Sequence, residues 1–380
     1  MPLPPPRFSG AVLRTLALAV RTPPGALAAR ALFRRDLGID QLARLPGAWR
    51  GPTPVDNAVV AGRPPRQGHD ERLGAPPGGD WPRGSSALTA AYRAGQLSPQ
   101  AVAGAALAAA RALAGRQPSM GPLMGYDDAG AERDALASEA RYRAGQPLGP
   151  LDGVPFVVKE ETGIAGFPLR LGTTCIAATP VEHDATIVAR LRAAGAIVLG
   201  QTPMTEYGLS PLGVSARRRL PRNPYRSDRV AGGSSTGSAV AVALGLCPFA
   251  IGADGGGSIR IPAAFCGLFG LKPTWGRVSR AGDAFGGTMD HLGPIASTTA
   301  DLAHFLEACA QPDAADAATR DAPALVPGAL VSALGRGVRG LRIGVLHDEF
   351  AAATPTIAAA CHAALAALER EGATLVPLRL

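Results

Sequence analysis

Two glycine-serine segments carry the residue types best suited to chemistry in this chain. Residues 232–238 read Gly-Gly-Ser-Ser-Thr-Gly-Ser and contain Ser234 and Ser235, whereas residues 254–258 read Asp-Gly-Gly-Gly-Ser and end at Ser258. Glycines before a serine let backbone N–H groups turn inward, because no Cβ obstructs them. A pair of inward N–H groups can stabilise the oxyanion that forms in acyl transfer. The second segment therefore predicts a nucleophile, Ser258, on the same turn as its oxyanion hole.

Lys159 is the candidate base for this serine. It follows the short apolar segment Val154–Val158, which predicts a buried strand. An amine at the inner end of a buried strand is desolvated, and desolvation favours its neutral form, which can take a proton from a serine. Of the 38 basic residues only Lys159 and Lys272 are lysines. Arginine can replace lysine as a surface charge but cannot lose a proton in the working pH range.

Each of these features has a more ordinary explanation when it stands alone. A glycine loop is usually a structural turn, and a lysine after a strand is usually a surface charge. A phosphate-binding loop is disfavoured, because residues 232–238 lack the lysine of GxxxxGK[ST] and neither segment has the GxGxxG pattern. The combination of both segments with Lys159 is what favours acyl-transfer chemistry.

Neither a metal nor an organic cofactor is predicted. The cysteines form no CxxC pair and no Cys/His cluster at zinc-ligand spacing: Cys175, Cys247, Cys266, Cys309 and Cys361. We expect reduced thiols, as in a cytoplasmic protein. No apolar run reaches the ~18 residues that cross a bilayer, and Arg14 and Arg21 interrupt the first apolar stretch, which argues against a secretory signal.

The elements that must position these residues alternate between helix and strand from Ser86 onward. Helical spacing of apolar residues predicts helices over residues 87–93, 98–113, 131–142, 184–194, 238–244, 299–310 and 356–371. Short apolar runs predict strands over residues 154–158, 196–200, 249–252, 341–346 and 374–378. This alternation predicts an α/β fold, with a largely parallel or mixed β-sheet core covered by helices on both faces.

Residues 1–85 are interpreted as a Pro/Arg-rich N-terminal extension of a domain over residues 86–380. The extension holds 14 of the 35 prolines, and 12 arginines against 6 acidic residues. Because most of the +8 net charge lies there, no nucleic-acid partner is expected for the body of the chain. Residues Ala11–Val20 and Ala26–Phe33 fit short amphipathic helices, for which a solvated or docked arm is favoured over a membrane surface. Six further arginines between residues 217 and 229 are interpreted as a solvated loop.

The combined segments resemble the amidase-signature family, whose members use a Ser–cis-Ser–Lys triad. Residues 232–238 resemble its GGSSGG segment, residues 254–262 match its D-x-G-G-S-I-R-x-P segment, and residues 153–159 resemble its lysine strand. Further similarity lies at residues 270–274 and 290–294. The separations also fit, with 99 residues from Lys159 to Ser258 and 24 from Ser234 to Ser258. The resemblance extends from about residue 87 to residue 380.

This resemblance implies the amidase-signature fold and a role for each matching residue. Ser258 would attack the carbonyl, and Ser234, after a cis Gly233–Ser234 peptide bond, would relay its proton to Lys159. The resemblance also implies oxyanion donors and two supporting hydrogen-bond partners: the N–H groups of Gly255, Gly256, Gly257 and Ser258, and the side chains of Ser235 and Asp254. The expected reaction is hydrolysis of a small-molecule amide to an acid and ammonia or an amine, through an acyl-enzyme and without a cofactor.

The sequence departs from the family pattern at several positions. They are Thr236, Gly255, Gln201, Pro203 and the pair Glu160-Glu161, which follows the lysine where Asp-Asn is usual. None removes a triad member, but Glu160 is expected to favour the charged form of Lys159. Family members also continue beyond the final predicted strand. The resemblance therefore implies a domain that lacks its C-terminal part, with an apolar edge that would favour a homo-oligomer.

Two other functions stay open. In the A subunit of an amidotransferase, the same triad releases ammonia from glutamine for a partner that acts on misacylated tRNA. A truncated, inactive homologue would keep the fold without the reaction. The sequence does not indicate which amide is cleaved.

Overall fold

The computed structural model describes Thr22 and residues 81–378, apart from residues 117, 119, 216, 217, 286–288, 324 and 352. Most of the predicted N-terminal extension, with its two predicted helices, lies outside the described residues. The domain boundary near residue 85 therefore stays a prediction from composition.

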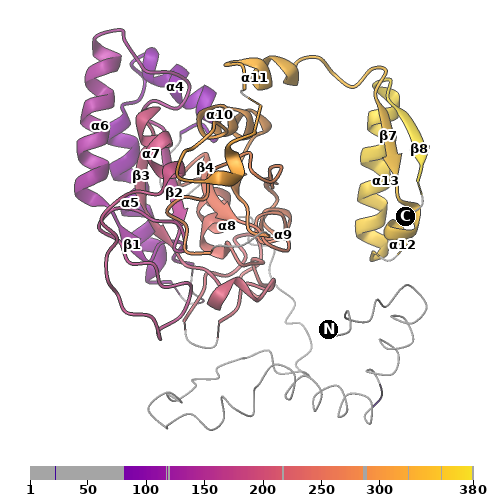
Figure 1. Ribbon diagram of the computed structural model, residues 1–380, viewed down its shortest axis with the longest axis horizontal. Helices are drawn as coiled ribbons and strands as arrows, with labels where there is room; N and C mark the ends of the chain where they lie inside the picture. The colour runs from indigo at the N-terminus through magenta and orange to yellow at the C-terminus, as the bar shows by residue number, and fades with distance from the viewer. Residues whose placement is uncertain are drawn as a thin grey trace. The chain divides into compact units, whose positions relative to one another are not determined.

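The core is a six-stranded mixed β-sheet (Figure 1). In spatial order its strands are β1 (Gly125–Tyr126), β3 (Ile197–Thr202), β2 (Pro155–Lys159), β4 (Phe249–Ala253), β6 (Leu292–Ala296) and β5 (Phe269–Gly270). β2 pairs in parallel with both β3 and β4, whereas the β1–β3, β4–β6 and β5–β6 pairs are antiparallel. The carboxyl ends of β2, β3 and β4 therefore lie at one edge of the sheet.

The central strands are buried on both faces, because successive side chains of a strand point to opposite sides. Val157 and Ala250 belong to one hydrophobic cluster, whereas Phe156, Val158 and Phe249 belong to another. The rings of Phe156 and Phe249 stack with their centroids 5.6 Å apart. Burial on both sides explains why β2 reads as a continuous apolar run rather than an alternating one.

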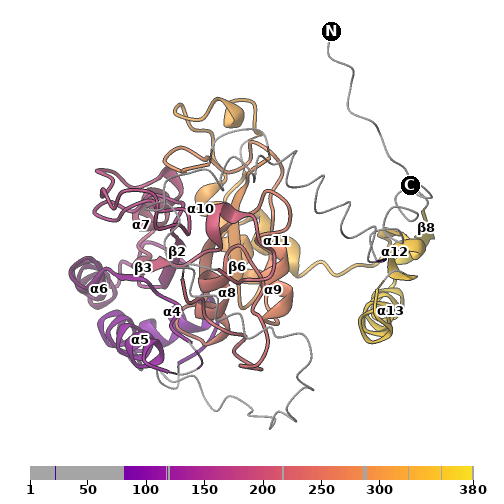
Figure 2. The ribbon, with the colours of Figure 1, turned by 90° about the horizontal axis from the view of Figure 1, so that it is seen from below.

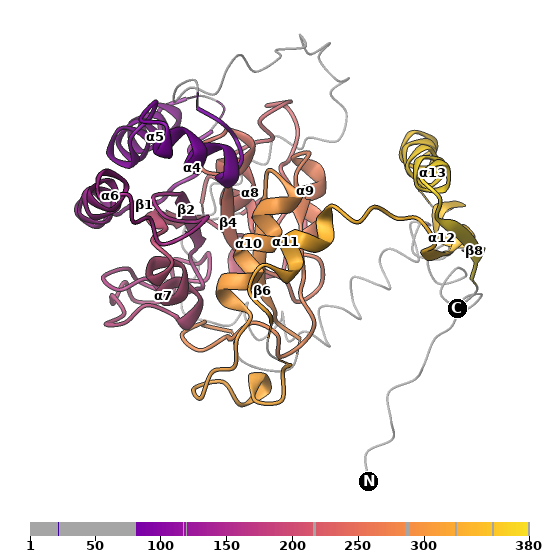
Figure 3. The ribbon, with the colours of Figure 1, turned by 90° about the horizontal axis from the view of Figure 1, so that it is seen from above.

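Helices cover both faces of the sheet, as predicted. One cluster receives side chains from α5 (Pro99–Ala114), α6 (Asp128–Arg143) and α8 (Thr236–Ala243), and the other from α4 (Ser85–Arg93), α7 (Thr186–Ala193) and α10 (Thr299–Cys309). α5 and α6 lie side by side, as Figures 2 and 3 show. The sheet is thus the middle of three layers.

Side-chain caps fix where several of these helices begin. Ser98 Oγ accepts the N–H of Ala101 at 3.2 Å, immediately before Pro99 at the first position of α5. Asp127 Oδ1 accepts the N–H of Gly130 at 3.1 Å, and this cap starts α6 three residues before the predicted position. Such caps stabilise a helix by about 1 kcal/mol.

The remaining elements are short or follow α10. They are α9 (Arg260–Phe265), α11 (Ala329–Leu334), α12 (His347–Ala351), α13 (Pro355–Arg370) and the 3₁₀ helices η2 (Glu206–Gly208) and η3 (Ala317–Thr319). The predicted strands β7 (Arg342–Val345) and β8 (Thr374–Pro377) pair in parallel as a separate two-stranded sheet, and α13 contacts β8. Within the described ranges, no helix is long and apolar enough to cross a membrane.

Strands β1, β5 and β6 are not predicted from the sequence. β6 contains Gly293 and Pro294, and a proline argues against a central strand. β6 nevertheless pairs with β4 from Phe249↔Ala296 to Ala253↔Leu292, and all of its residues are buried. Burial against the core therefore outweighs the local preference of this segment.

Candidate active site

The residues with predicted chemistry lie at the carboxyl edge of the parallel strands. Lys159 is the last residue of β2, and Ala253 is the last residue of its neighbour β4. Ser234 and Ser235 directly precede α8, and Ser258 lies in the loop between β4 and α9. Open α/β sheets commonly bind their ligands at this edge. The fold thus gathers three separate segments of the sequence.

Lys159 and Ser234 are in direct contact. The Lys159 amine lies 2.7 Å from Ser234 Oγ, and each residue is only 1% exposed. Lys159 Nζ also donates to the Ala253 carbonyl at 3.3 Å. The peptide bond between Gly233 and Ser234 is cis, as the family resemblance implies. The structure therefore places a buried amine against a buried serine hydroxyl.

Ser235 links its own loop, residues 232–235 (the serine loop), to β4 and to the loop of Ser258. Its hydroxyl donates to the Ala253 carbonyl at 3.3 Å and accepts the Ala253 N–H at 3.3 Å. Its backbone N–H donates to the Ser258 carbonyl at 3.3 Å. Ser258 itself is half-buried. The two glycine-serine segments are thus joined through the backbone beside Lys159.

Asp254 holds the loop that carries Ser258. Its buried carboxylate accepts the N–H of Gly257 at 2.6 Å and that of Ile259 at 3.1 Å, and it forms a two-point ion pair with Arg260 at 2.9 and 3.0 Å. Burial alone would raise the pKa of Asp254, but the hydrogen bonds from Arg260, Ile259 and Gly257 outweigh it and hold this pKa below its ordinary value. Arg260 thus also helps to hold this loop. It lies within residues 254–262, which match the family segment, but the sequence predicts no role for it.

The predicted oxyanion donors are not equivalent. The N–H of Gly257 is engaged by Asp254, whereas no acceptor among the described residues takes the N–H of Gly255, Gly256 or Ser258. Gly255 and Gly256 are exposed, so their N–H groups can face a ligand. Gly257 has φ +127° and packs against Ile261, so a Cβ there would lie 2.6 Å from Ile261 Cδ1. Only glycine fits this position without strain.

The carboxylate beside Lys159 is Glu161, and the expectation for Glu160 is wrong. Lys159 Nζ donates to Glu161 Oε1 at 2.8 Å, and both side chains are 1% exposed. Glu160 instead accepts from Arg218 at 2.6 Å and from the N–H of Met204 at 2.9 Å. The reason is the turn that follows β2 directly, in which the N–H of Thr162 donates to the Lys159 carbonyl at 2.9 Å and Glu161, not Glu160, comes to lie beside the amine.

The other departures from the family pattern make local contacts. Thr236 Oγ1 donates to the Gly232 carbonyl at 2.9 Å, within the serine loop. Gln201 Nε2 donates to the Pro168 carbonyl at 2.9 Å, and the Pro203 carbonyl accepts the N–H of Gly237 at 3.0 Å. These contacts support the serine loop and the end of β3.

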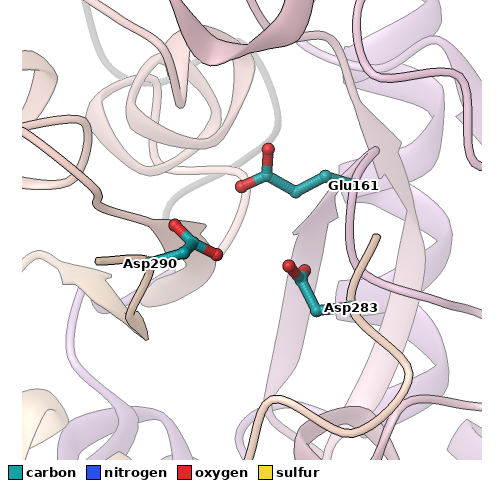
Figure 4. A group of neighbouring side chains, drawn as sticks. All are labelled: Glu161, Asp283 and Asp290. Atoms are coloured by element: carbon teal, nitrogen blue, oxygen red, sulfur yellow. The ribbon is translucent and has the colours of Figure 1, made fainter. Parts of the chain in front are cut away.

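Glu161 also belongs to a group of three acidic residues, which is the candidate metal-binding group among the described residues. Glu161, Asp283 and Asp290 each offer one oxygen, and these oxygens lie within 4.8 Å of one another (Figure 4). Burial raises the pKa of Glu161, against the opposing effect of the Lys159 charge. Burial, with the charges of Glu161 and Asp290, raises the pKa of Asp283 well above its ordinary value. No sequence spacing indicates this group, because Glu161 and Asp283 are 122 positions apart.

One family model and several known proteins are similar to this chain. The model of the Amidase family matches residues 108–380. The A subunit of the glutamyl-tRNA(Gln) amidotransferase of Deinococcus radiodurans is 39% identical over 291 residues, which are 76% of this chain and 58% of that protein. The native peptide amidase of Stenotrophomonas maltophilia has a TM-score of 0.70 and 35% identity, with 78% of this chain and 62% of that chain covered.

A bacterial aryl acylamidase of the amidase signature family is a further structural relative. Its TM-score is 0.65 at 30% identity, with 78% of this chain and 60% of that chain covered. The chain thus spans between 58% and 62% of the length of these three relatives.

Proposed function

The chain belongs to the amidase family, and on this premise we propose that it hydrolyses a carboxylic amide to a carboxylic acid and ammonia or an amine. The observation that carries the proposal is the 2.7 Å contact between the buried Lys159 amine and Ser234 Oγ. A base within hydrogen-bond reach of a serine hydroxyl is what activates a weak oxygen nucleophile. The Ser258 loop lies beside this pair and supplies that nucleophile.

The proposed reaction has two halves. Ser258 Oγ attacks the carbonyl carbon, its proton passes to Ser234, and Ser234 gives its own proton to the neutral amine of Lys159. The proton then returns to the leaving nitrogen as the carbon–nitrogen bond breaks, which leaves an ester on Ser258. Water attacks this ester with the same proton relay, and the carboxylic acid departs as Ser258 regains its proton. Serine and lysine supply the chemistry, so the proposal requires no cofactor.

The Glu161 carboxylate favours the charged form of Lys159, whereas the proposed relay uses the neutral amine. A neutral amine has two N–H donors and one lone pair. Glu161 Oε1 at 2.8 Å and the Ala253 carbonyl at 3.3 Å can take the two N–H groups. The lone pair then faces Ser234 Oγ, ready to accept its proton. These contacts also orient the amine, which a general base needs for efficient transfer.

We assign the oxyanion hole to the N–H groups of Gly255, Gly256 and Ser258. These three have no acceptor among the described residues, whereas Gly257 donates to Asp254 at 2.6 Å. In this assignment Gly257 shapes the loop rather than binding the oxyanion. Removal of one oxyanion donor typically costs about 10²- to 10³-fold in rate.

The second candidate is an amidotransferase A subunit that releases ammonia from glutamine. The similarity to the amidotransferase of Deinococcus radiodurans, at 39% identity to its A subunit, favours it. The same proton relay would serve, with glutamine as the amide and a partner protein as the consumer of ammonia. Hydrolysis of simple amides without a partner supports the first candidate, whereas turnover confined to glutamine supports the second.

A fluorophosphonate probe tests the assignment of the nucleophile, because it bonds to an activated serine. We expect mass mapping to place the adduct on Ser258, and Ser258→Ala to abolish both the adduct and amide turnover. The control is Ser332→Ala, an exposed position in α11, which is expected to keep both. An adduct on Ser234 would exchange the two roles. Absence of both adduct and turnover in the wild-type chain would instead support an inactive homologue.

A further inference from the structure

Three carboxyl groups from distant segments point toward one another (Figure 4). One of them, Glu161, also contacts Lys159 at 2.8 Å. Glu161 follows β2, Asp290 precedes β6, and Asp283 lies in the preceding loop. Glu161 is 1% exposed, whereas Asp283 and Asp290 are half-buried. Asp283 and Asp290 are thus the members of the group that keep some solvent exposure.

Two oxygens of this group are buried without a hydrogen-bond donor. Both oxygens of Asp283 have donors, Thr162 Oγ1 at 3.0 Å and the N–H of Phe285 at 3.1 Å, and Glu161 Oε1 is paired with Lys159. By contrast, Glu161 Oε2 and Asp290 Oδ2 find no donor among the described residues. A buried polar atom without a partner is costly, and the cost is larger for a charged group. A ligand bound within this group would supply the missing donors.

The group also lacks positive charge. In the described part of the chain, the three carboxyls have one basic partner, Lys159, which pairs with Glu161. Buried charges of one sign are unfavourable unless a counter-charge lies close to them. Burial is the main cause of the raised pKa values of Glu161 and Asp283, and the neighbouring carboxylates raise both further. A cation bound here would satisfy both the charge and the two unpaired oxygens.

The number of available acceptors suits an ammonium group, whose three N–H donors form charge-assisted hydrogen bonds with carboxylate oxygens. Ca²⁺ and Mg²⁺ take six or more oxygen ligands, and three of the oxygens here already accept hydrogen bonds from the protein. An ammonium needs only two or three acceptors, so it fits the available oxygens better.

The group lies next to the loop assigned to the reaction. Asp290 Oδ1 is 3.9 Å from the position of a Cβ at Gly255, and Glu161 contacts Lys159 at 2.8 Å. We propose that Glu161, Asp283 and Asp290 bind a primary ammonium group of the substrate, on the acyl side of the scissile amide. This inference rests on the proposed amide hydrolysis and names its substrate class as amino-substituted amides.

Matched pairs of amides test the proposal. β-Alaninamide and butanamide have the same number of heavy atoms and differ in a terminal ammonium against a methyl group; longer ω-amino amides are paired with alkanamides in the same way. We expect kcat/KM to favour the ammonium member by about tenfold or more at the chain length that fits, the value of one charge-assisted hydrogen bond. Asp283→Asn and Asp290→Asn are each expected to reduce this preference about tenfold.

The control is Asp228→Asn, which removes a surface carboxylate paired with Arg226 and is expected to keep the preference. A preference near one at every chain length in the wild-type enzyme would overturn the proposal. So would an equal loss on both members of a pair in Asp283→Asn and Asp290→Asn, because it would show a structural role.

Calorimetry with propylammonium separates this proposal from the proposed reaction. Binding of propylammonium, with 1-propanol as the neutral control, needs no turnover. If no amide is hydrolysed, the proposed function fails, while binding that is lost in Asp283→Asn still supports the site. Binding of Ca²⁺ or Mg²⁺ that is lost in Asp283→Asn, without binding of propylammonium, would assign the group to a metal ion and overturn the proposal.

Discussion

Replacement of Lys159 by arginine separates its positive charge from its ability to lose a proton. The guanidinium stays charged in the working pH range, so it can still pair with Glu161, which lies 2.8 Å from Nζ in the wild-type chain. It cannot take the proton of Ser234. A positioned general base contributes about 10²- to 10⁴-fold, which is about 3–5 kcal/mol at 1.36 kcal/mol per tenfold. We expect kcat for amide hydrolysis to fall by at least about a hundredfold.

A second variant separates loss of the base from loss of the fold. Lys159→Met removes the charge and leaves Glu161 buried without its ion-pair partner, in a site where both side chains are 1% exposed. Breaking a buried pair in this way costs about 3–5 kcal/mol. Lys159→Arg keeps the pair but must fit a larger head group into the same space, at about 1–3 kcal/mol. We expect a larger drop in melting temperature for Lys159→Met than for Lys159→Arg.

The assay is steady-state turnover of one amide, with a thermal melt of each variant. The matched control is Lys272→Arg, which is expected to keep both turnover and stability. Among the described residues, Lys272 Nζ has one acceptor, the Pro273 carbonyl at 2.7 Å. If Lys159→Arg folds and loses less than about tenfold in kcat, Lys159 is not the base and the proposed relay is wrong.

Three further predictions concern the loops and the extension. The pKa of Asp254 is held below its ordinary value, so the ionised Asp254 stabilises the fold fully above the unfolded-state pKa, and this stabilisation is lost as pH falls below about 4. The difference in unfolding free energy between wild type and Arg260→Ala should therefore shrink as pH falls from about 6 to 3. Gly257→Ala should lose about 1–3 kcal/mol in denaturant unfolding, from a φ of +127° and the contact with Ile261, whereas Gly256→Ala, with open space at its Cβ, should stay within about 0.5 kcal/mol. Equal losses in these two variants would contradict that reasoning. Removal of residues 1–80 should leave melting temperature and turnover nearly unchanged, and a drop of many degrees would show that the extension packs on the domain.

The sequence predicts the parts of the site that rest on local patterns. The apolar run 154–158 and Lys159 appear as β2, and the two glycine-serine segments lie at the ends of α8 and β4. Each of these patterns spans only a few residues. The apolar run indicates a strand buried on both faces, and glycine before serine indicates a loop with inward N–H groups. The contact between Lys159 and Ser234 is implied by the family resemblance and appears at 2.7 Å.

The parts that the sequence does not predict depend on contacts between distant residues. β6 contains Pro294, whose local preference opposes a strand, and only its burial against β4 makes one. No sequence pattern indicates that Asp283 and Glu161 lie close together, because the loop that brings them together depends on the whole sheet. The expectation for Glu160 fails for a simpler reason, because a residue next to Lys159 in the chain need not lie next to its amine in space.

The carbonyl oxygen of Ala253 accepts hydrogen bonds from both Lys159 Nζ and Ser235 Oγ, each at 3.3 Å. A point mutation can replace either side chain but cannot remove a backbone oxygen. The alignment of Lys159 with Ser235 therefore does not depend on which residue type occupies position 253. Small residues that fit this buried position can therefore replace one another over evolution without loss of that alignment. An insertion or deletion within β4 would displace both partners together. Natural variation along this strand is expected to appear as substitution and not as change in length.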